Sequence, residues 1–175
     1  MTGRRHRPGA LAIAAVALAT ATASAEPVRP GAGQVQADLG LSVVGLGYER
    51  ALATHVALAG EAGIFGTYFL PWFDRGDDVA GLMVGARATW FARADHRGLY
   101  LTPYLRGVAV RGTAGGQSGD GVGVAAGVFV GWSVGLTRRV DLRVGAGAQY
   151  IRVDADPLGA STPFVALDAV VGYRL

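Results

Sequence analysis

The sequence contains no cysteine and no lysine among its 175 residues. The absence of cysteine excludes disulfide bonds, a thiolate nucleophile, a cysteine-ligated metal and a lipid-modified cysteine. The absence of lysine excludes a lysine-dependent phosphate-binding loop, so the glycine pair Gly121 and Gly123 does not form a nucleotide motif. Disorder is also excluded, because 51% of the residues are hydrophobic. The 28 glycines favour strands that pass close to one another.

Positive charge is scarce once the start of the chain is set aside. Three arginines precede an apolar stretch over residues 10–22, and Ala23-Ser24-Ala25 has the small-residue pattern of a cleavage site. This order is typical of a secretory signal peptide, so residues 1–25 are predicted to be removed. Of the 16 arginines, 13 remain after that removal and balance the 13 acidic residues. The mature domain, 26–175, is therefore expected to be neutral, and no nucleic-acid partner is predicted.

A run without any charge covers residues 121–137, GVGVAAGVFVGWSVGLT. Its even-numbered positions are apolar from Val122 to Leu136, and its odd-numbered positions are mostly small. A period of two indicates a strand, because successive side chains of a strand point to opposite faces. A helix would mix the two sets on every face, and the repeated glycines would weaken it. The run therefore predicts a long strand over 122–137 and not a membrane helix.

The same alternation recurs along the rest of the mature chain. It predicts further strands over 34–42, 56–64, 80–90, 99–107, 140–150 and 163–175. Short polar turns are expected at 52–55, 92–98 and 137–140, and longer loops at 70–79, 113–121 and 153–162. Strands joined alternately by short turns and longer loops make an antiparallel up-and-down meander. The alternation slips near Val43-Val44, which leaves either a hairpin and eight strands or one bulged strand and seven.

An amphipathic meander can close in two ways. A soluble barrel such as a lipocalin points its apolar face inward, whereas a transmembrane barrel points it toward lipid. Here the other face carries many glycines and few charges, which suits the crowded interior of a small barrel better than a soluble surface. We therefore predict an inward polar network of Glu61, Arg87, Arg106, Arg143 and Asp168. We also predict an aromatic girdle at the membrane interface, made of Tyr48, Trp90, Trp132 and Tyr173.

These features resemble the small outer-membrane β-barrel proteins of Gram-negative bacteria. The stretch YERALATHVALAGEAG (48–63) is similar to their strand, short turn and strand unit, and the last strand resembles their C-terminal assembly signal, although it ends in Leu175 instead of Phe. Such barrels have even strand numbers, so eight strands are favoured. The resemblance implies an all-β fold, an integral place in the outer membrane, lipid as a partner, and assembly machinery that recognises the C-terminal strand.

No catalytic or cofactor-binding residue is predicted. The mature histidines, His55 and His96, are expected to be solvated in short turns that face the periplasm. A Ser–His pair that cleaves outer-leaflet lipid would need its histidine at the opposite end of the barrel. The acidic loop residues match no complete calcium motif, so no metal is predicted. The extracellular loop candidates are Trp72, Phe73, Asp74, Asp77 and Asp78. The sequence thus predicts a non-enzymatic barrel with a structural, adhesive or binding role; the alternatives are a transport or pore protein and a soluble lipocalin-like binder.

Overall fold

The described part of the chain is built from strands. The computed structural model describes residues 26–66, 78–155 and 158–175. The eight strands are β1 (Gly33–Leu39), β2 (Val43–Ala53), β3 (Val56–Gly66), β4 (Asp78–Phe91), β5 (Gly98–Ala114), β6 (Gln117–Gly135), β7 (Val140–Ala155) and β8 (Leu158–Arg174). The described ranges hold no helix that is long and apolar enough to cross a membrane.

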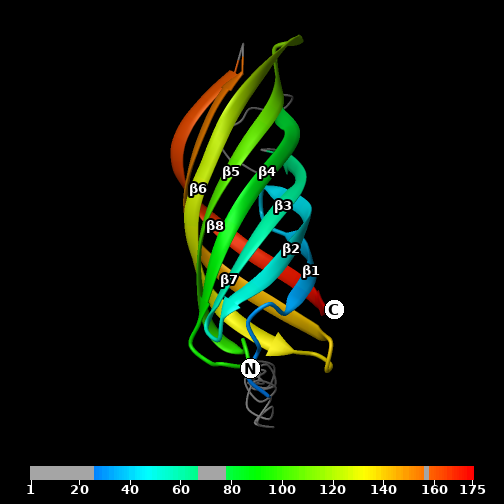
Figure 1. The fold of residues 1–175 in the computed structure, drawn as a ribbon. Coiled ribbons are helices and arrows are strands. Elements are labelled where there is room, and N and C mark those ends of the chain that lie inside the picture. Colours follow the sequence, from blue (N-terminus) through cyan, green and yellow to red (C-terminus); the bar gives the residue numbers. More distant parts are fainter. Residues whose placement is uncertain (1–25, 67–77, 156–157) are drawn as a thin grey trace, which may run out of the picture.

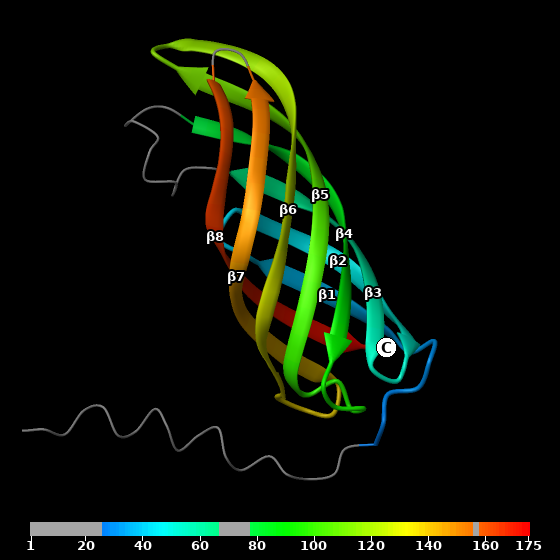
Figure 2. The ribbon, with the colours of Figure 1, turned by 90° about the vertical axis from the view of Figure 1, so that its left-hand side faces the viewer.

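The strands form a closed antiparallel barrel in sequence order, in which β8 pairs with β1 (Figure 1). Following cross-strand partners from Asp38 through each strand leads to Ala160 on β8, whereas the direct partner of Asp38 on β8 is Val170. The sheet therefore closes with a stagger of ten residues, from 160 to 170. This stagger tilts the strands against the barrel axis, as Figure 2 shows.

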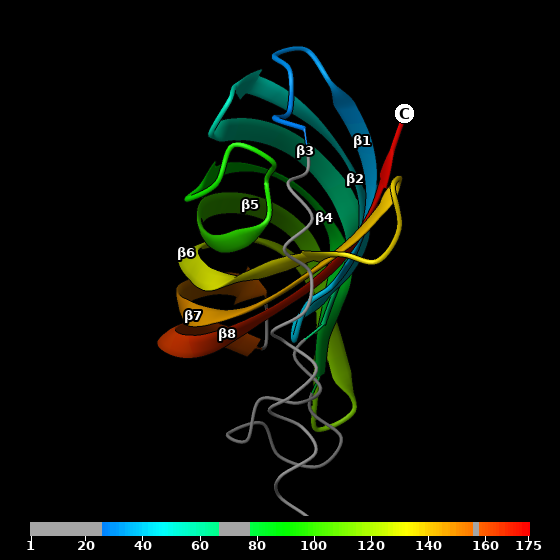
Figure 3. The same ribbon diagram turned by 90° about the horizontal axis from the view of Figure 1, so that it is seen from below.

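The two ends of the barrel differ. One end, called here the short-turn end, holds the connections 54–55, 92–97 and 136–139, and there the start of β1 meets the end of β8. There the Leu175 amide donates to the Gly33 carbonyl over 3.1 Å. Figure 3 looks into this end and shows the strands curving around the axis. At the other end, the long-hairpin end, β5 and β6 project farthest (Figure 1).

The eight-strand alternative is confirmed, because a hairpin at 40–42 separates β1 from β2 where the alternation slips. Two of the three expected long loops are wrong. Over 113–121 the strands β5 and β6 continue to a tight turn at Gly115 and Gly116, whose φ angles of 56° and 81° favour glycine. Over 153–162 the strands β7 and β8 continue to Ala155 and from Leu158. The glycine and polar residues of these segments predict a loop. The segments nevertheless form strands, and they lack hydrophobic alternation because they lie beyond the outward apolar band of the barrel.

The apolar face of the barrel points outward and the charged face points inward. Leu82 and Val122 on the outside are 70% and 69% exposed, whereas the inward Arg87 and Arg106 are 4% and 3% exposed. The interior is narrow enough that backbones and side chains meet closely. A Cβ atom on Gly147, for example, would collide with the carbonyl oxygen of Val128 on the neighbouring strand. Glycine at such inward positions is therefore a requirement of the tight, staggered closure.

Candidate functional site in the barrel interior

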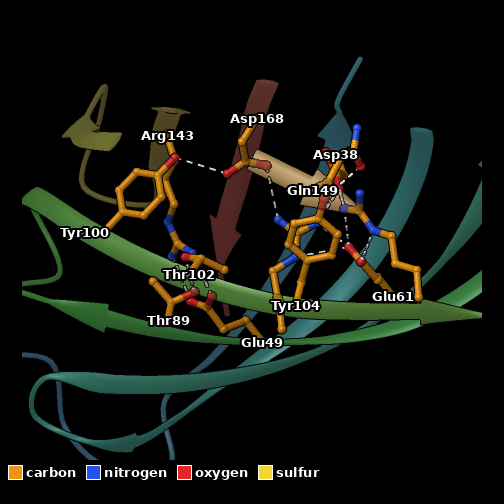
Figure 4. A network of polar contacts seen from close by, with 12 residues as sticks. Asp38, Glu49, Glu61, Thr89, Tyr100, Thr102, Tyr104, Arg143, Gln149 and Asp168 are labelled. Carbon is orange, nitrogen blue, oxygen red and sulfur yellow. Dashed lines mark hydrogen bonds and ion pairs between the residues drawn. The ribbon is translucent and has the colours of Figure 1, made fainter. Parts of the chain in front are cut away.

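A central cluster of ion pairs crosses the barrel at mid-height. Arg87 on β4 contacts the carboxylates of both Asp38 on β1 and Glu61 on β3. Its Nη1 also lies 3.4 Å from Asp168 Oδ1 on β8. Arg106 on β5 donates from Nε to Glu61 Oε1 over 2.7 Å and from Nη2 to Asp38 Oδ2 over 2.8 Å. The strands β1, β3, β4, β5 and β8 thus contribute to one connected network, of which Figure 4 labels Asp38, Glu61 and Asp168.

The central cluster holds more carboxylates than guanidinium groups. Its two arginines, Arg87 and Arg106, face three acids, Asp38, Glu61 and Asp168. Neutral donors and rings supply further support. The hydroxyl of Tyr100 donates to Asp168 Oδ2 over 3.0 Å, as Figure 4 shows. The guanidinium of Arg106 lies 4.4 Å from the centre of the Tyr104 ring, and that ring stacks on Phe129. These contacts fill the middle of the barrel with side chains.

A second cluster lies toward the short-turn end. Arg143 on β7 binds Glu49 on β2 through two parallel hydrogen bonds of 2.6 and 2.7 Å. Its guanidinium also lies 4.8 Å from the centre of the Phe91 ring and 3.4 Å from Asp141. Two parallel bonds match the planar guanidinium to a carboxylate, which is the strongest geometry for such a pair. Figure 4 shows this pair set apart from Asp38 and Glu61.

The structure divides the residues that the sequence assigned to one polar network. It brings Glu61, Arg87, Arg106 and Asp168 together and places Arg143 in the second cluster. Sequence reasoning missed the partner acids Asp38, Glu49 and Asp141. Asp38 occupies a polar position of the alternation at 34–42, so the sequence alone indicates that its side chain points inward. Glu49 follows the phase slip at Val43, which concealed the face on which it lies.

The interior changes character toward the long-hairpin end. There the inward side chains form an apolar cluster, made of Val43, Phe65, Val79, Met83, Val108, Val110, Ala125, Ile151, Val153 and Ala155. Its members come from β2 to β7, and they lie beyond the central ion pairs along those strands. The half of the interior toward the short-turn end, called here the lower interior, is therefore rich in ion pairs, whereas the half toward the long-hairpin end, the upper interior, is apolar.

The four aromatic residues assigned to the girdle lie on the outer face. Tyr48, Trp90, Trp132 and Tyr173 are each about half exposed. Trp90, Trp132 and Tyr173 stand near the short-turn ends of their strands, and Tyr48 stands at the middle of the shorter strand β2. Four loop candidates, Trp72, Phe73, Asp74 and Asp77, lie outside the described residues, while Asp78 is the first residue of β4. In the described ranges, no three acidic or histidine side chains are grouped in a way that could hold a metal.

The expectation that both histidines are solvated is wrong for His96. His55 is exposed, but His96 is only 5% exposed and stacks on the Phe91 ring with the two ring centres 4.1 Å apart. The positive φ of 58° at His96 turns the chain so that its ring lies against the Phe91 ring. One ring nitrogen lies 3.1 Å from the Thr54 carbonyl oxygen. The sequence offered no signal for this burial, because it depends on how two neighbouring turns meet.

The turn at His96 predicts acid sensitivity. Burial lowers the pKa of His96 to about 4, with Arg143 and Arg174 adding to the decrease and Glu49 and the Thr54 carbonyl opposing it. The unfolded chain binds this proton near pH 6.5 and the folded chain does not, so His96 lowers stability as the pH falls from about 6.5 to about 4. The pKa of Asp95 is also lowered: burial raises it, but hydrogen bonds from Arg93 and Arg97 outweigh burial. The stability that Asp95 contributes is lost mainly below the ordinary pKa of 3.8, so most of the slope over this range comes from His96.

We expect the variant His96→Asn, which tolerates a positive φ, to flatten the decline in unfolding free energy over this range. Urea titrations of both proteins at a series of pH values from 7 to about 4.5 measure the difference. Parallel curves for wild type and variant would contradict this prediction, because they would show that folding does not change the pKa of His96.

Comparison with known proteins supports the fold. No protein-family model and no curated protein matches the sequence. Among solved structures, the N-terminal β-barrel domain of Pseudomonas aeruginosa OprF is similar with a TM-score of 0.63 and 15% identity, covering 83% of this chain and 98% of that one. Neisserial surface protein A is similar with a TM-score of 0.52 and 17% identity, covering 82% and 95%. The chain therefore has the eight-stranded antiparallel fold of the small outer-membrane β-barrels.

Proposed function

We propose that the protein is a non-enzymatic, integral β-barrel of the bacterial outer membrane, exported by the signal peptide at 1–25. The observation that carries this proposal is the inversion of the two faces. Apolar side chains such as Leu46, Leu82 and Val122 are exposed around the outside, whereas ion-paired arginines and carboxylates are buried within. A water-soluble barrel with these faces would expose a continuous apolar belt, which soluble monomers avoid. In lipid the same belt is the favoured surface.

We infer that the role of the protein is structural, adhesive or binding, and that it is exercised at the long-hairpin end. The β5–β6 hairpin reaches farthest there, and Arg111 and Asp120 form an ion pair across it, with Nε and Oδ1 2.9 Å apart. Both side chains are exposed, so the hairpin offers polar groups on a stiff two-stranded arm. The ionic lower interior supports a mechanical role, because it ties strands that are distant in sequence. The C-terminal strand β8 would be the segment that the assembly machinery recognises.

A second candidate is the transport or binding of a hydrophobic compound. The apolar cluster in the upper interior favours it, because that region could accept an apolar molecule from the long-hairpin end. The ion pairs of Arg87 and Arg106 obstruct passage through the middle. A pore for small solutes is the related alternative, and recordings in a planar bilayer test it: steady conductance favours a pore, whereas a structural barrel gives no conductance.

The proposal is tested by electrophoresis of membrane fractions with and without boiling. A closed barrel resists unfolding in detergent at room temperature and unfolds on heating, so its mobility shifts. We expect this shift in protein recovered from the outer-membrane fraction. Protein that is released by osmotic shock without detergent and shows no shift would overturn the proposal and favour a soluble lipocalin-like binder.

A further inference from the structure

Arginines without acidic partners gather at the short-turn end. Arg50, Arg97, Arg138 and Arg139, called here the arginine rim, make no ion pair with any described residue. The other arginines at this end have acidic partners: Arg29 pairs with Glu26, Arg93 with Asp95, and Arg174 with Asp141. The arginine rim therefore leaves several positive charges uncompensated on the described surface of this end.

The arginine rim stands beside the outward aromatic residues. Arg139 donates from Nη1 to the Tyr173 hydroxyl over 3.1 Å. Arg50 lies two residues beyond Tyr48 on the same outward face of β2, and both are exposed. Arg97 and Arg138 line a depression of about 780 Å³ at the mouth of the barrel. The Nε of Arg97 is buried there without a hydrogen-bond partner. Positive charge thus follows the aromatic level around the outside and continues into the mouth.

Among the described residues, the opposite end has no such excess. Its described arginines, Arg111 and Arg152, are matched by Asp120 and Asp154, and Arg111 is paired directly with Asp120. The charge difference between the ends therefore depends on where the charged residues lie along the barrel axis, not on how many of them the chain contains. It is hidden in the composition, because the mature chain has equal numbers of basic and acidic residues.

We propose that the arginine rim binds the anionic phosphate headgroups of phospholipids in the leaflet that faces the short turns. This inference rests on the proposed membrane location. Aromatic side chains such as Tyr173 mark the level of the headgroups. An arginine next to these aromatic side chains lies at the depth of the lipid phosphates, and its planar guanidinium can donate two parallel hydrogen bonds to phosphate oxygens. The proposal therefore names the partner by its chemistry: an acidic phospholipid such as phosphatidylglycerol, favoured over a zwitterionic one.

The experiment measures lipid preference at the short-turn end. The mature chain carrying Trp72→Phe is reconstituted in phosphatidylcholine, which leaves Trp90 and Trp132 near the short-turn end as reporters. Brominated phosphatidylglycerol or brominated phosphatidylcholine is then added, and quenching of tryptophan fluorescence gives the relative binding constant of the two lipids. We expect wild type to prefer phosphatidylglycerol and to lose that preference as salt screens the charges.

Two matched double variants make the test specific. Arg50→Gln/Arg139→Gln removes two arginines of the rim, and we expect the preference to fall by up to about fivefold for each arginine removed. Arg111→Gln/Arg152→Gln removes two exposed arginines at the other end and should leave the preference unchanged. Equal binding of both lipids to a wild-type barrel that still shows the heat-dependent mobility shift would overturn this inference alone. Equal losses in both variants would also overturn it, and failure of wild type to insert would overturn the proposed membrane location.

Discussion

Replacing Arg87 with alanine is expected to lower the free energy of unfolding of the membrane-embedded barrel by about 3–5 kcal/mol. The Arg87 side chain is 4% exposed and contacts Asp38, Glu61 and Asp168. Without it, Arg106 alone pairs with Asp38 and Glu61, and Asp168 loses its guanidinium partner. Removing one member of a buried ionic cluster is more damaging than losing one contact, because the remaining charges stay buried and unpaired.

The measurement is a urea titration of protein inserted in lipid vesicles, followed by tryptophan fluorescence. Arg152→Ala is the matched control, because Arg152 is exposed on β7 and makes no ion pair with the described residues. It should leave the unfolding midpoint unchanged. Should Arg87→Ala fail to insert, Arg87→Lys keeps the charge but loses the planar fork, and we expect an intermediate loss. Wild-type stability in both Arg87 variants would show that the central cluster contributes nothing to folding.

Replacing Arg143 with alanine is expected to have an effect of similar size without changing the membrane location. Arg143 makes two parallel bonds to Glu49 and lies over the Phe91 ring. Its loss leaves Glu49, which is 3% exposed, without its cationic partner. We expect the free energy of unfolding to fall by about 3–5 kcal/mol, measured by the same titration. Membrane fractionation checks that the variant still reaches the outer membrane.

A double variant separates the charge from the space that the pair fills. Glu49→Leu/Arg143→Met replaces both ions with apolar groups of similar size, and we expect it to recover most of the stability that Arg143→Ala loses. Recovery would show that the single variant is damaged by the stranded carboxylate. A double variant as unstable as Arg143→Ala would instead assign the loss to the other contacts of the guanidinium, with Asp141 and the face of the Phe91 ring.

Much of the fold was predictable because strand alternation is a local property. The period of two in 121–137 identifies a strand and the face on which each residue lies, whatever the rest of the chain does. The inward positions of Arg87 and Arg106 follow from the same rule. The residues at which the outermost strands end were less predictable. Residues 113–121 form the end of a hairpin, because backbone pairing between β5 and β6 holds them without hydrophobic alternation.

The amino-acid sequence by itself determined the antiparallel barrel and the inward and outward faces of most strands. Only the tertiary structure decided which inward charges meet. The stagger of ten residues brings Asp38 on β1 beside Arg87 and Arg106, which are 49 and 68 residues away in the chain. The same stagger sets Arg143 level with Glu49 and apart from the central cluster. Alternation fixes a residue's face but not its height, because height depends on the register between strands and on how the ring closes.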